Sequence, residues 1–247
     1  MPKRPTFRVY NNTIQEYFDH LISSHPKPKF SVAFADVPDN IGLKYDGVND
    51  KLPIDEYTHL LHTTIAFAQF CPVWISFNTR WLPLMGQLSA KFPVSVHPCV
   101  QTITFGAHQK ARTKLTDCQR PLWLFVPQYM KRWKFEKYHI PSVRQELGDD
   151  RAEATGKMPP NVFDFVRVVH NDKQRRPWHP TQLNEGLVER ALRLTAPDHS
   201  RVLDLFSGTG TTAIVSKRLK LSCVSVEASA EYAYRISLPL GVDVETV

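Results

Sequence analysis

This 247-residue sequence has few of the residues that mark disulfide frameworks and metal centres. Its four cysteines are widely spaced and include no Cys-x-x-Cys pair, which argues against structural zinc and redox chemistry. Small buried thiols in a reducing compartment explain them better. The ten histidines include no His-Glu-x-x-His or comparable helical ligand spacing. We therefore predict no bound metal.

Long apolar runs are also missing. No window approaches eighteen apolar residues, and the charged first residues have no apolar segment behind them, so we predict neither a membrane span nor a signal peptide. With 42% hydrophobic residues, the chain is long enough for one sizeable α/β domain with a small inserted region. We expect a soluble, cytoplasmic protein that is a monomer or a homodimer.

The net charge of +7 is concentrated in one part of the chain. Residues 107–176 contain fifteen Lys or Arg and eight Asp or Glu, whereas the rest of the chain contains sixteen of each kind. A solvated basic face would be the simpler explanation of the charge surplus alone. However, aromatic residues are interleaved with these cations, a mixture that suits phosphate neutralisation and base stacking. They are Trp123, Tyr129, Trp133, Phe135 and Tyr138. We therefore favour a nucleic-acid partner.

The N-terminal half begins with a predicted strand, helix and strand. Residues 29–35 are a short apolar run that ends at an exposed loop, residues 54–69 have mostly helical spacing, and residues 73–77 form the next strand. Two further strands, 100–105 and 122–126, flank a basic turn and resemble an antiparallel pair.

Regularity weakens between residues 127 and 177, which predicts a smaller lobe or a set of recognition loops. Regular structure returns with a helix that Thr181 is placed to cap and that extends to Leu194. A strand from Arg201, a helix over about 211–220 and a strand over 221–227 follow it.

The segment from Arg201 to Thr212 runs from an apolar strand into a Phe-x-Gly-x-Gly turn and a helix. Gly208 and Gly210 allow the backbone to approach a ligand closely. Glu227 ends the next strand, where an acid in a doubly wound fold binds ribose hydroxyls. NAD would also satisfy this geometry, but a third glycine is missing and Phe206 offers an apolar surface to an adenine or methionyl group. S-adenosylmethionine fits better.

A second candidate site is Asp36-Val-Pro-Asp-Asn40, which follows the first predicted strand. Methylation of an exocyclic amine requires acceptors that hold both N–H groups while the nitrogen becomes tetrahedral. The Asp36 carboxylate and the Val37 carbonyl can supply them, with a sulfonium methyl on the opposite side. For these residues alone, a simple turn at the end of a strand is an equally good explanation.

Together these segments resemble the DNA amino-methyltransferases that modify adenine N6 or cytosine N4, in the permuted order with the catalytic block first. Asp36 to Asn40 is similar to the family's Asp-Pro-Pro-Tyr motif, Trp178 to Gln182 to the segment before its cofactor helix, and Val202 to Thr212 to its glycine turn. The resemblance implies a Rossmann-like, mixed but mostly parallel sheet with an inserted target-recognition region, and S-adenosylmethionine as cofactor. The implied cofactor-binding residues are Phe206, Gly208, Gly210, Thr211, Thr212, Glu227, His179, Thr181 and Gln182.

The resemblance divides the chain into a catalytic half at 1–126, a target-recognition region at 127–177 and a cofactor-binding half at 178–247. It implies methyl transfer to a flipped base in double-stranded DNA, in a restriction-modification setting. An initial Asp favours adenine N6, and cytosine N4 stays an alternative. Two other functions stay open: a catalytically weakened DNA-binding protein on the same scaffold, and methylation of RNA or of a small amine.

Two residues depart from the family motif. Val37 replaces a proline, which keeps the carbonyl acceptor but loosens a loop that Pro38 still stiffens. Asp39 replaces the aromatic residue that would stack on the flipped base, a contact worth about 1–3 kcal/mol. We hypothesise that Tyr45 supplies the missing ring, and simple packing of Tyr45 in its loop is an equal alternative. The catalytic candidates are thus Asp36, Val37, Pro38, Asp39 and Tyr45.

Overall fold

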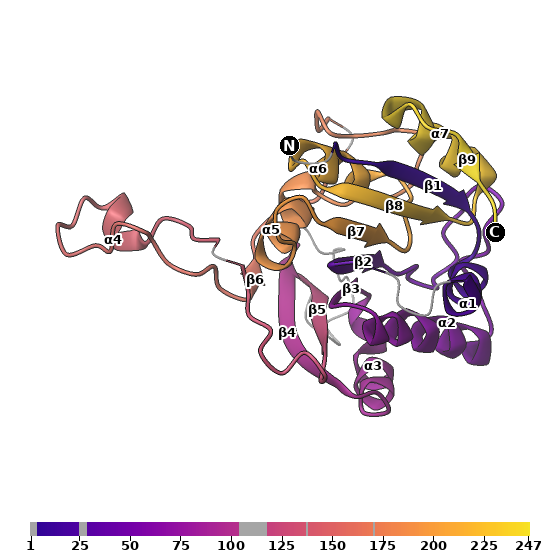
Figure 1. The fold of residues 1–247 in the computed structure, drawn as a ribbon, viewed down its shortest axis with the longest axis horizontal. Helices are drawn as coiled ribbons and strands as arrows, with labels where there is room; N and C mark the ends of the chain where they lie inside the picture. Colours follow the sequence, from indigo (N-terminus) through magenta and orange to yellow (C-terminus); the bar gives the residue numbers. More distant parts are fainter. Residues whose placement is uncertain (1–3, 25–28, 104–117, 137, 170) are drawn as a thin grey trace, which may run out of the picture.

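A computed structural model describes residues 4–24, 29–103, 118–136, 138–169 and 171–247. Within these residues, the strands form one nine-stranded sheet in the order β6-β4-β5-β3-β2-β7-β8-β1-β9 (Figure 1). The pairs β3–β5 and β4–β5 are antiparallel and the other pairs are parallel. This confirms the predicted mixed, mostly parallel sheet. The strands are β1 (Phe7–Asn11), β2 (Val32–Asp36), β3 (Val73–Ser76), β4 (Val94–Thr102), β5 (Gln119–Pro127), β6 (Val162–Phe163), β7 (Arg201–Asp204), β8 (Ser222–Glu227) and β9 (Val244–Glu245).

Helices cover both faces of the sheet because the strands are apolar on both faces. On one face, Ala33, Ala35 and Ile75 pack in a cluster with the first three α-helices. On the other face, Phe34 and Trp74 pack with α5 and α6. The helices are α1 (Ile14–Ser24), α2 (Ile54–Ala66), α3 (Leu82–Ser89), α4 (Val143–Glu146), α5 (Glu185–Thr195), α6 (Thr211–Arg218) and α7 (Ala230–Leu240), with short 3-10 turns at Phe67–Gln69 and Thr79–Trp81.

The predicted elements are present, with shifted boundaries. The helix expected from Thr181 begins instead at Glu185, where the side chain of Asn184 accepts a hydrogen bond from the Gly186 N–H, so Thr181 as the cap was wrong. The predicted strand at 100–105 begins earlier, at Val94, and its expected last two residues lie outside the described residues.

The sequence analysis did not predict β1 and α1. β1 lies between β8 and β9 and pairs with both in parallel, so a strand from the 1–126 range completes the sheet of the 178–247 range. Part of the segment between β5 and β6 projects from the body of the protein, and Figure 1 shows this part as an arm with α4 near its tip. No helix among the described residues is both long and apolar enough to cross a bilayer.

Candidate active site

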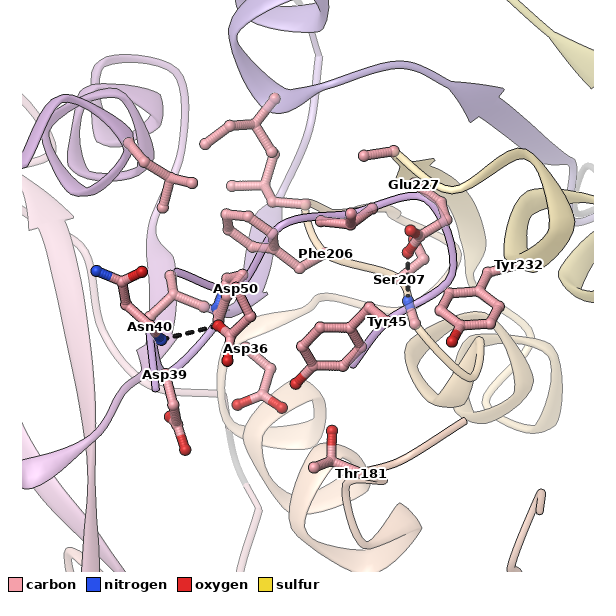
Figure 2. Close-up of a pocket in the computed structure, with 18 of the residues that line it drawn as sticks. Asp36, Asp39, Asn40, Tyr45, Asp50, Thr181, Phe206, Ser207, Glu227 and Tyr232 are labelled. Atoms are coloured by element: carbon pink, nitrogen blue, oxygen red, sulfur yellow. Dashed lines mark hydrogen bonds between the residues drawn. The ribbon is translucent and has the colours of Figure 1, made fainter. Parts of the chain in front are cut away.

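The candidate site lies at one edge of the sheet because the side chains that form it follow the carboxyl ends of parallel strands. Asp36 ends β2, Asp204 ends β7 and Glu227 ends β8. These strands are neighbours or next neighbours in the sheet. In an open α/β sheet this edge is the usual place for a ligand. Figure 2 shows Asp36, Tyr45 and Phe206 among the side chains that line a pocket.

One cavity of about 1090 Å³ connects the predicted catalytic segment with the predicted cofactor turn. All the predicted site residues except Gly210 line it, and they come from both ends of the chain: Asp36, Val37, Pro38, Asp39, Tyr45, His179, Thr181, Gln182, Phe206, Gly208, Thr211, Thr212 and Glu227. Pockets of about 300–1,000 Å³ accommodate drug-sized ligands. The cavity therefore has room for a cofactor and part of a substrate.

The catalytic segment is held by side chains from three later parts of the chain. The Tyr57 hydroxyl donates to the Pro38 carbonyl at 2.6 Å, and Trp81 Nε1 donates to the Asp39 carbonyl at 2.9 Å. The buried Asp50 carboxylate accepts the N–H groups of Asn40, Ile41 and Leu43. Asn40 has a φ of 55°, in the left-handed region that asparagine tolerates better than most residues. These contacts fix the loop even though Val37 stands in place of a proline.

Arg120, which the sequence analysis did not select, lies directly on the catalytic segment. Its Nη1 donates to Asp39 Oδ1 at 2.7 Å, its Nη2 donates to Asp36 Oδ1 at 3.1 Å and lies 3.4 Å from the Val37 carbonyl oxygen, and its Nε donates to Ser76 Oγ at 2.7 Å. The pairing of strands explains this position. Because β5 runs antiparallel to β3, the start of β5 lies beside the carboxyl ends of β3 and β2.

The ionisation of this cluster reflects burial and charge pairing together. Burial raises the pKa of Asp36, while Arg120 and a hydrogen bond from Ser76 oppose the rise. Burial alone would lower the pKa of Arg120, but the two carboxylates raise it. Arg120 is therefore charged at every physiological pH, and its charge favours the ionised form of Asp36 against the effect of burial.

The glycine turn and Glu227 form the other part of the cavity. Gly208 has a φ of 49°, and its N–H donates to Glu227 Oε2 at 2.7 Å (Figure 2). Glu227 Oε1 accepts the Ser229 N–H at 2.9 Å. Burial raises the pKa of Glu227, and these backbone donors oppose the rise. The carboxylate is thus fixed at the cavity wall.

Asp204 is a buried acid that the sequence analysis also missed. Its Oδ2 is buried and has no hydrogen-bond partner within the described part of the chain. Burial raises its pKa to about 8, although side-chain hydrogen bonds from Ser207 and Thr212 oppose the rise. The pattern that could have revealed it is its place at the end of a buried strand, four residues before Gly208. Asp204 is one of the residues that line the cavity.

Aromatic side chains form a wall beside the glycine turn. The His179 ring is 4.7 Å from the Tyr232 ring and 5.3 Å from the Tyr45 ring between centroids. Burial lowers the pKa of His179 to about 4, so this ring is neutral at pH 7. A Cβ atom at Gly208 would lie 3.2 Å from His179 Nε2. The structure thus brings Tyr45 into the cavity together with the cofactor turn.

Two predicted cofactor residues have clear structural contacts. Gly210 does not line the cavity; it has a φ of 73° and precedes α6, and a Cβ there would lie 3.2 Å from Ile236 of α7. Gln182 lines the cavity, but its amide bonds to the Arg176 N–H and the Gln174 carbonyl. We infer that Gly210 allows close packing of the glycine turn against α7, and that the Gln182 side chain holds the backbone at Gln174 and Arg176.

The basic segment has two kinds of residue. Trp133, Phe135 and Tyr138 are partly buried and pack against the core cluster that includes α5, which argues against their interpretation as base-stacking rings. The neighbouring cations Lys131, Arg132 and Lys134 are exposed, as is Tyr129. Of the predicted basic turn between residues 105 and 122, residues 106–117 lie outside the described residues. No group of three or more side chains that could hold a metal ion occurs in the part of the chain that the structure describes.

The sequence of this chain is similar to those of DNA methyltransferases. Residues 89–238 match the model of the N6/N4 methyltransferase family, described as DNA methylase. The type II methyltransferase M.ScaI of Streptomyces caespitosus is 24% identical over 242 residues, which cover 86% of this chain and 75% of that protein. The DNA adenine methyltransferase YhdJ of Escherichia coli is 25% identical over 224 residues, 84% of this chain and 74% of YhdJ.

The fold is also found among solved structures. The cytosine-N4-specific PvuII DNA methyltransferase superposes with a TM-score of 0.65 at 15% identity, over 95% of this chain and 88% of that one. Because the family model covers more than half of the sequence, the chain belongs to the N6/N4 DNA methylase family and is a methyltransferase. The predicted cofactor, S-adenosylmethionine, agrees with this family. The match begins at residue 89, so the Asp36–Asn40 loop lies outside the matched residues.

Proposed function

We propose that this protein transfers a methyl group from S-adenosylmethionine to the exocyclic amine of a flipped base in double-stranded DNA, with adenine N6 as the first choice. The observation that supports this proposal most strongly is that Asp36 and Val37 line the same cavity as the glycine turn and Glu227. A base in that cavity would meet acceptors on one side and the methyl donor on the other. Base flipping is required because the amine is otherwise inside the stacked duplex.

Asp36 and Val37 would hold the amine. Their two oxygens lie close enough that Arg120 Nη2 contacts both, so one –NH₂ group can donate to the pair. Two such acceptors favour the pyramidal nitrogen of the transition state over the flat ground state, and this difference is what accelerates transfer. Tyr45 would stack on the base, in the role that Asp39 cannot perform.

The residues of the glycine turn fit the cofactor. Gly208 allows close backbone approach, Glu227 would accept from ribose hydroxyls, and Phe206 and His179 offer flat surfaces to the adenine. Asp204 supports the fit further, because its buried Oδ2 has no hydrogen-bond partner among the described residues, and such an oxygen favours a hydrogen-bonding ligand group. The cofactor supplies an electrophilic methyl group on sulfur, and the other cofactor residues would hold it in place.

Three further features belong to the same proposal. The initial Asp and the similarity to YhdJ support adenine, while the fold shared with the PvuII enzyme keeps cytosine N4 as the alternative. The projecting arm and its flanks, within 127–177, would recognise the target, between a catalytic half at 1–126 and a cofactor half at 178–247. The exposed cations of that region suit a phosphate backbone.

The test is transfer of tritium from labelled S-adenosylmethionine into mixed-sequence duplex DNA, followed by nucleoside mass spectrometry. We expect labelled N6-methyladenine, with no label after Asp36→Ala. Labelled N4-methylcytosine would support the alternative base. Full transfer by Asp36→Ala would contradict the assigned role of the loop.

A second candidate function is a DNA-binding protein with weakened catalysis. The observation that favours it is the Arg120 guanidinium, which occupies both proposed acceptors. In that case the protein would bind S-adenosylmethionine and DNA without transferring the methyl group. Binding of both ligands by calorimetry, with unlabelled DNA in the transfer assay, would support this function over the first.

A further inference from the structure

The amino group of Arg120 resembles the amine that the site is proposed to methylate. Nη2 is a planar –NH₂ group on a conjugated carbon, as are adenine N6 and cytosine N4, and each offers two N–H donors. Nη2 makes the contacts expected of the target amine: 3.1 Å to Asp36 Oδ1 and 3.4 Å to the Val37 carbonyl oxygen. We call this carboxylate and carbonyl the amine acceptors. A base amine and Arg120 cannot occupy them together.

We propose that Arg120 occupies the amine acceptors as an internal stand-in for the target, and that an amine-bearing base must displace its Nη2 group, while Asp39 retains the rest of the guanidinium. This inference rests on the proposed function and extends it to the selection of the base. Arg120 would thereby act as a specificity-determining residue.

The contact distances indicate which end of Arg120 is released. Nη1 donates to Asp39 and Nε donates to Ser76 at 2.7 Å each, whereas both contacts of Nη2 are longer. Charge-assisted hydrogen bonds are the stronger when they are short. The guanidinium is therefore held mainly at Asp39 and Ser76, and a small movement about this anchor frees the amine acceptors.

The ion pair with Arg120 explains why an aspartate stands at position 39 in place of the aromatic residue of the family motif. An aromatic ring at this position would give Arg120 no anion to bind, and the cation would then rely on Asp36. With Asp39 present, the side chains of Arg120 and Asp39 are only 18% and 19% exposed and form an ion pair at 2.7 Å. The two residues thus form one device, in which Asp39 holds Arg120 before and after the base enters.

Charge gives a second reason for displacement. Alkylation of an amine places positive charge on its nitrogen, and a guanidinium in contact with the same acceptors would oppose that charge. Transfer therefore requires Nη2 to leave. A base without an exocyclic amine has no –NH₂ group to replace Nη2. Displacement of Nη2 by such a base would leave the buried carboxylate with fewer donors, so the base is rejected.

The test measures nucleoside binding, which does not depend on turnover. The wild type and Arg120→Met are titrated by calorimetry with adenosine, cytidine, inosine and uridine, in the presence of a non-reactive cofactor analogue. We expect Arg120→Met to bind adenosine or cytidine about tenfold more tightly, a change of the size that loss of one competing contact gives. Inosine and uridine, which lack the amine, should show no such gain.

Two further variants keep the test decisive. Arg120→Lys retains a charge between Asp36 and Asp39 but has one nitrogen, where Arg120 uses Nη1 for Asp39 and Nη2 for the amine acceptors. It should therefore cover the acceptors less completely and show a smaller gain, and it tests the inference if Arg120→Met does not fold. Arg193→Met, in a surface ion pair with Glu189 on α5, controls for the lost charge and should bind every nucleoside as the wild type does.

The outcomes separate this inference from the proposed function. A gain restricted to amine-bearing nucleosides supports the displacement of Arg120, even if no variant methylates DNA, a result that would contradict the proposed function alone. Equal or weaker adenosine and cytidine binding by folded Arg120→Met and Arg120→Lys would overturn the inference, whatever their transfer activity. An equal gain for inosine and uridine would also overturn it, because it would mean that Arg120 merely fills space.

Discussion

The carboxylate of Asp50 lies 2.8 Å from the backbone nitrogen of Asn40 and fixes the end of the catalytic segment. Its second oxygen accepts the N–H groups of Ile41 and Leu43 at 3.2 and 2.9 Å. Asp50 is only 3% exposed, so water cannot easily replace it. One acidic side chain therefore holds three backbone donors of a loop that contains no regular structure.

We expect Asp50→Ala to lower the free energy of unfolding by about 2–4 kcal/mol, because buried hydrogen bonds to a charged group contribute strongly and their donors would be left unpaired. Methyl transfer should fall further than cofactor binding, since the glycine turn is on other strands. Urea denaturation and cofactor calorimetry measure the two effects. The control is Asp198→Ala, at an exposed loop position; an equal loss in both variants would contradict the role of Asp50.

Gly208 is the second position where a small change should have a large effect. Its φ of 49° disfavours any side chain, and an added Cβ would lie 3.2 Å from the His179 ring. We expect Gly208→Ala to cost about 1–3 kcal/mol of stability and to weaken cofactor binding. The matched control is Gly86→Ala, at an exposed helical position of α3 with nothing within 4 Å of the added Cβ, which should gain about 0.5–1 kcal/mol. Unchanged cofactor affinity in Gly208→Ala would contradict the assignment.

Asp204 predicts a pH dependence of stability. Burial raises its folded pKa from 3.8 to about 8, so between these values the folded state binds more protons than the unfolded state. The stabilisation by the protonated form is complete below about pH 4 and is lost as the pH rises to about 8. In Asp204→Asn this loss should be absent. Unfolding free energies measured from pH 4 to 9 should therefore show the wild type declining relative to the variant, and parallel curves would contradict the raised pKa.

The exposed cations of the basic segment predict a salt-dependent affinity for DNA. If Lys131, Arg132 and Lys134 contact phosphates, their joint replacement by Ala should reduce the slope of log K against log salt by about 0.9 per lost contact. Fluorescence anisotropy of a labelled duplex over a range of salt concentrations measures this slope. A wild-type slope in the triple variant would place DNA on another surface. The partly buried rings of Trp133 and Phe135 beside these cations should be left unchanged, because they pack against the core.

The sequence by itself determined the parts of the protein whose chemistry is local. An apolar run that ends in Asp36, and another that enters Phe206-Ser-Gly-Thr-Gly210, specify strands and turns within a few residues, because strand burial and left-handed glycines act at short range. The same patterns gave the permuted order of the two blocks. The mixed sheet and the family followed from them, and both were confirmed.

The tertiary structure decided which distant side chains meet. From the sequence, Asp39 is interpreted as the loss of a stacking ring. In the fold, its carboxylate accepts a hydrogen bond from Arg120, which lies 81 residues later in the chain. The sequence predicts one nucleic-acid-binding surface for the basic segment. In the fold, Arg120 lies in the candidate active site and Trp133 packs against the core. These contacts depend on the antiparallel pairing of β5 with β3, and strand pairing between distant segments leaves no periodic signal in either segment alone.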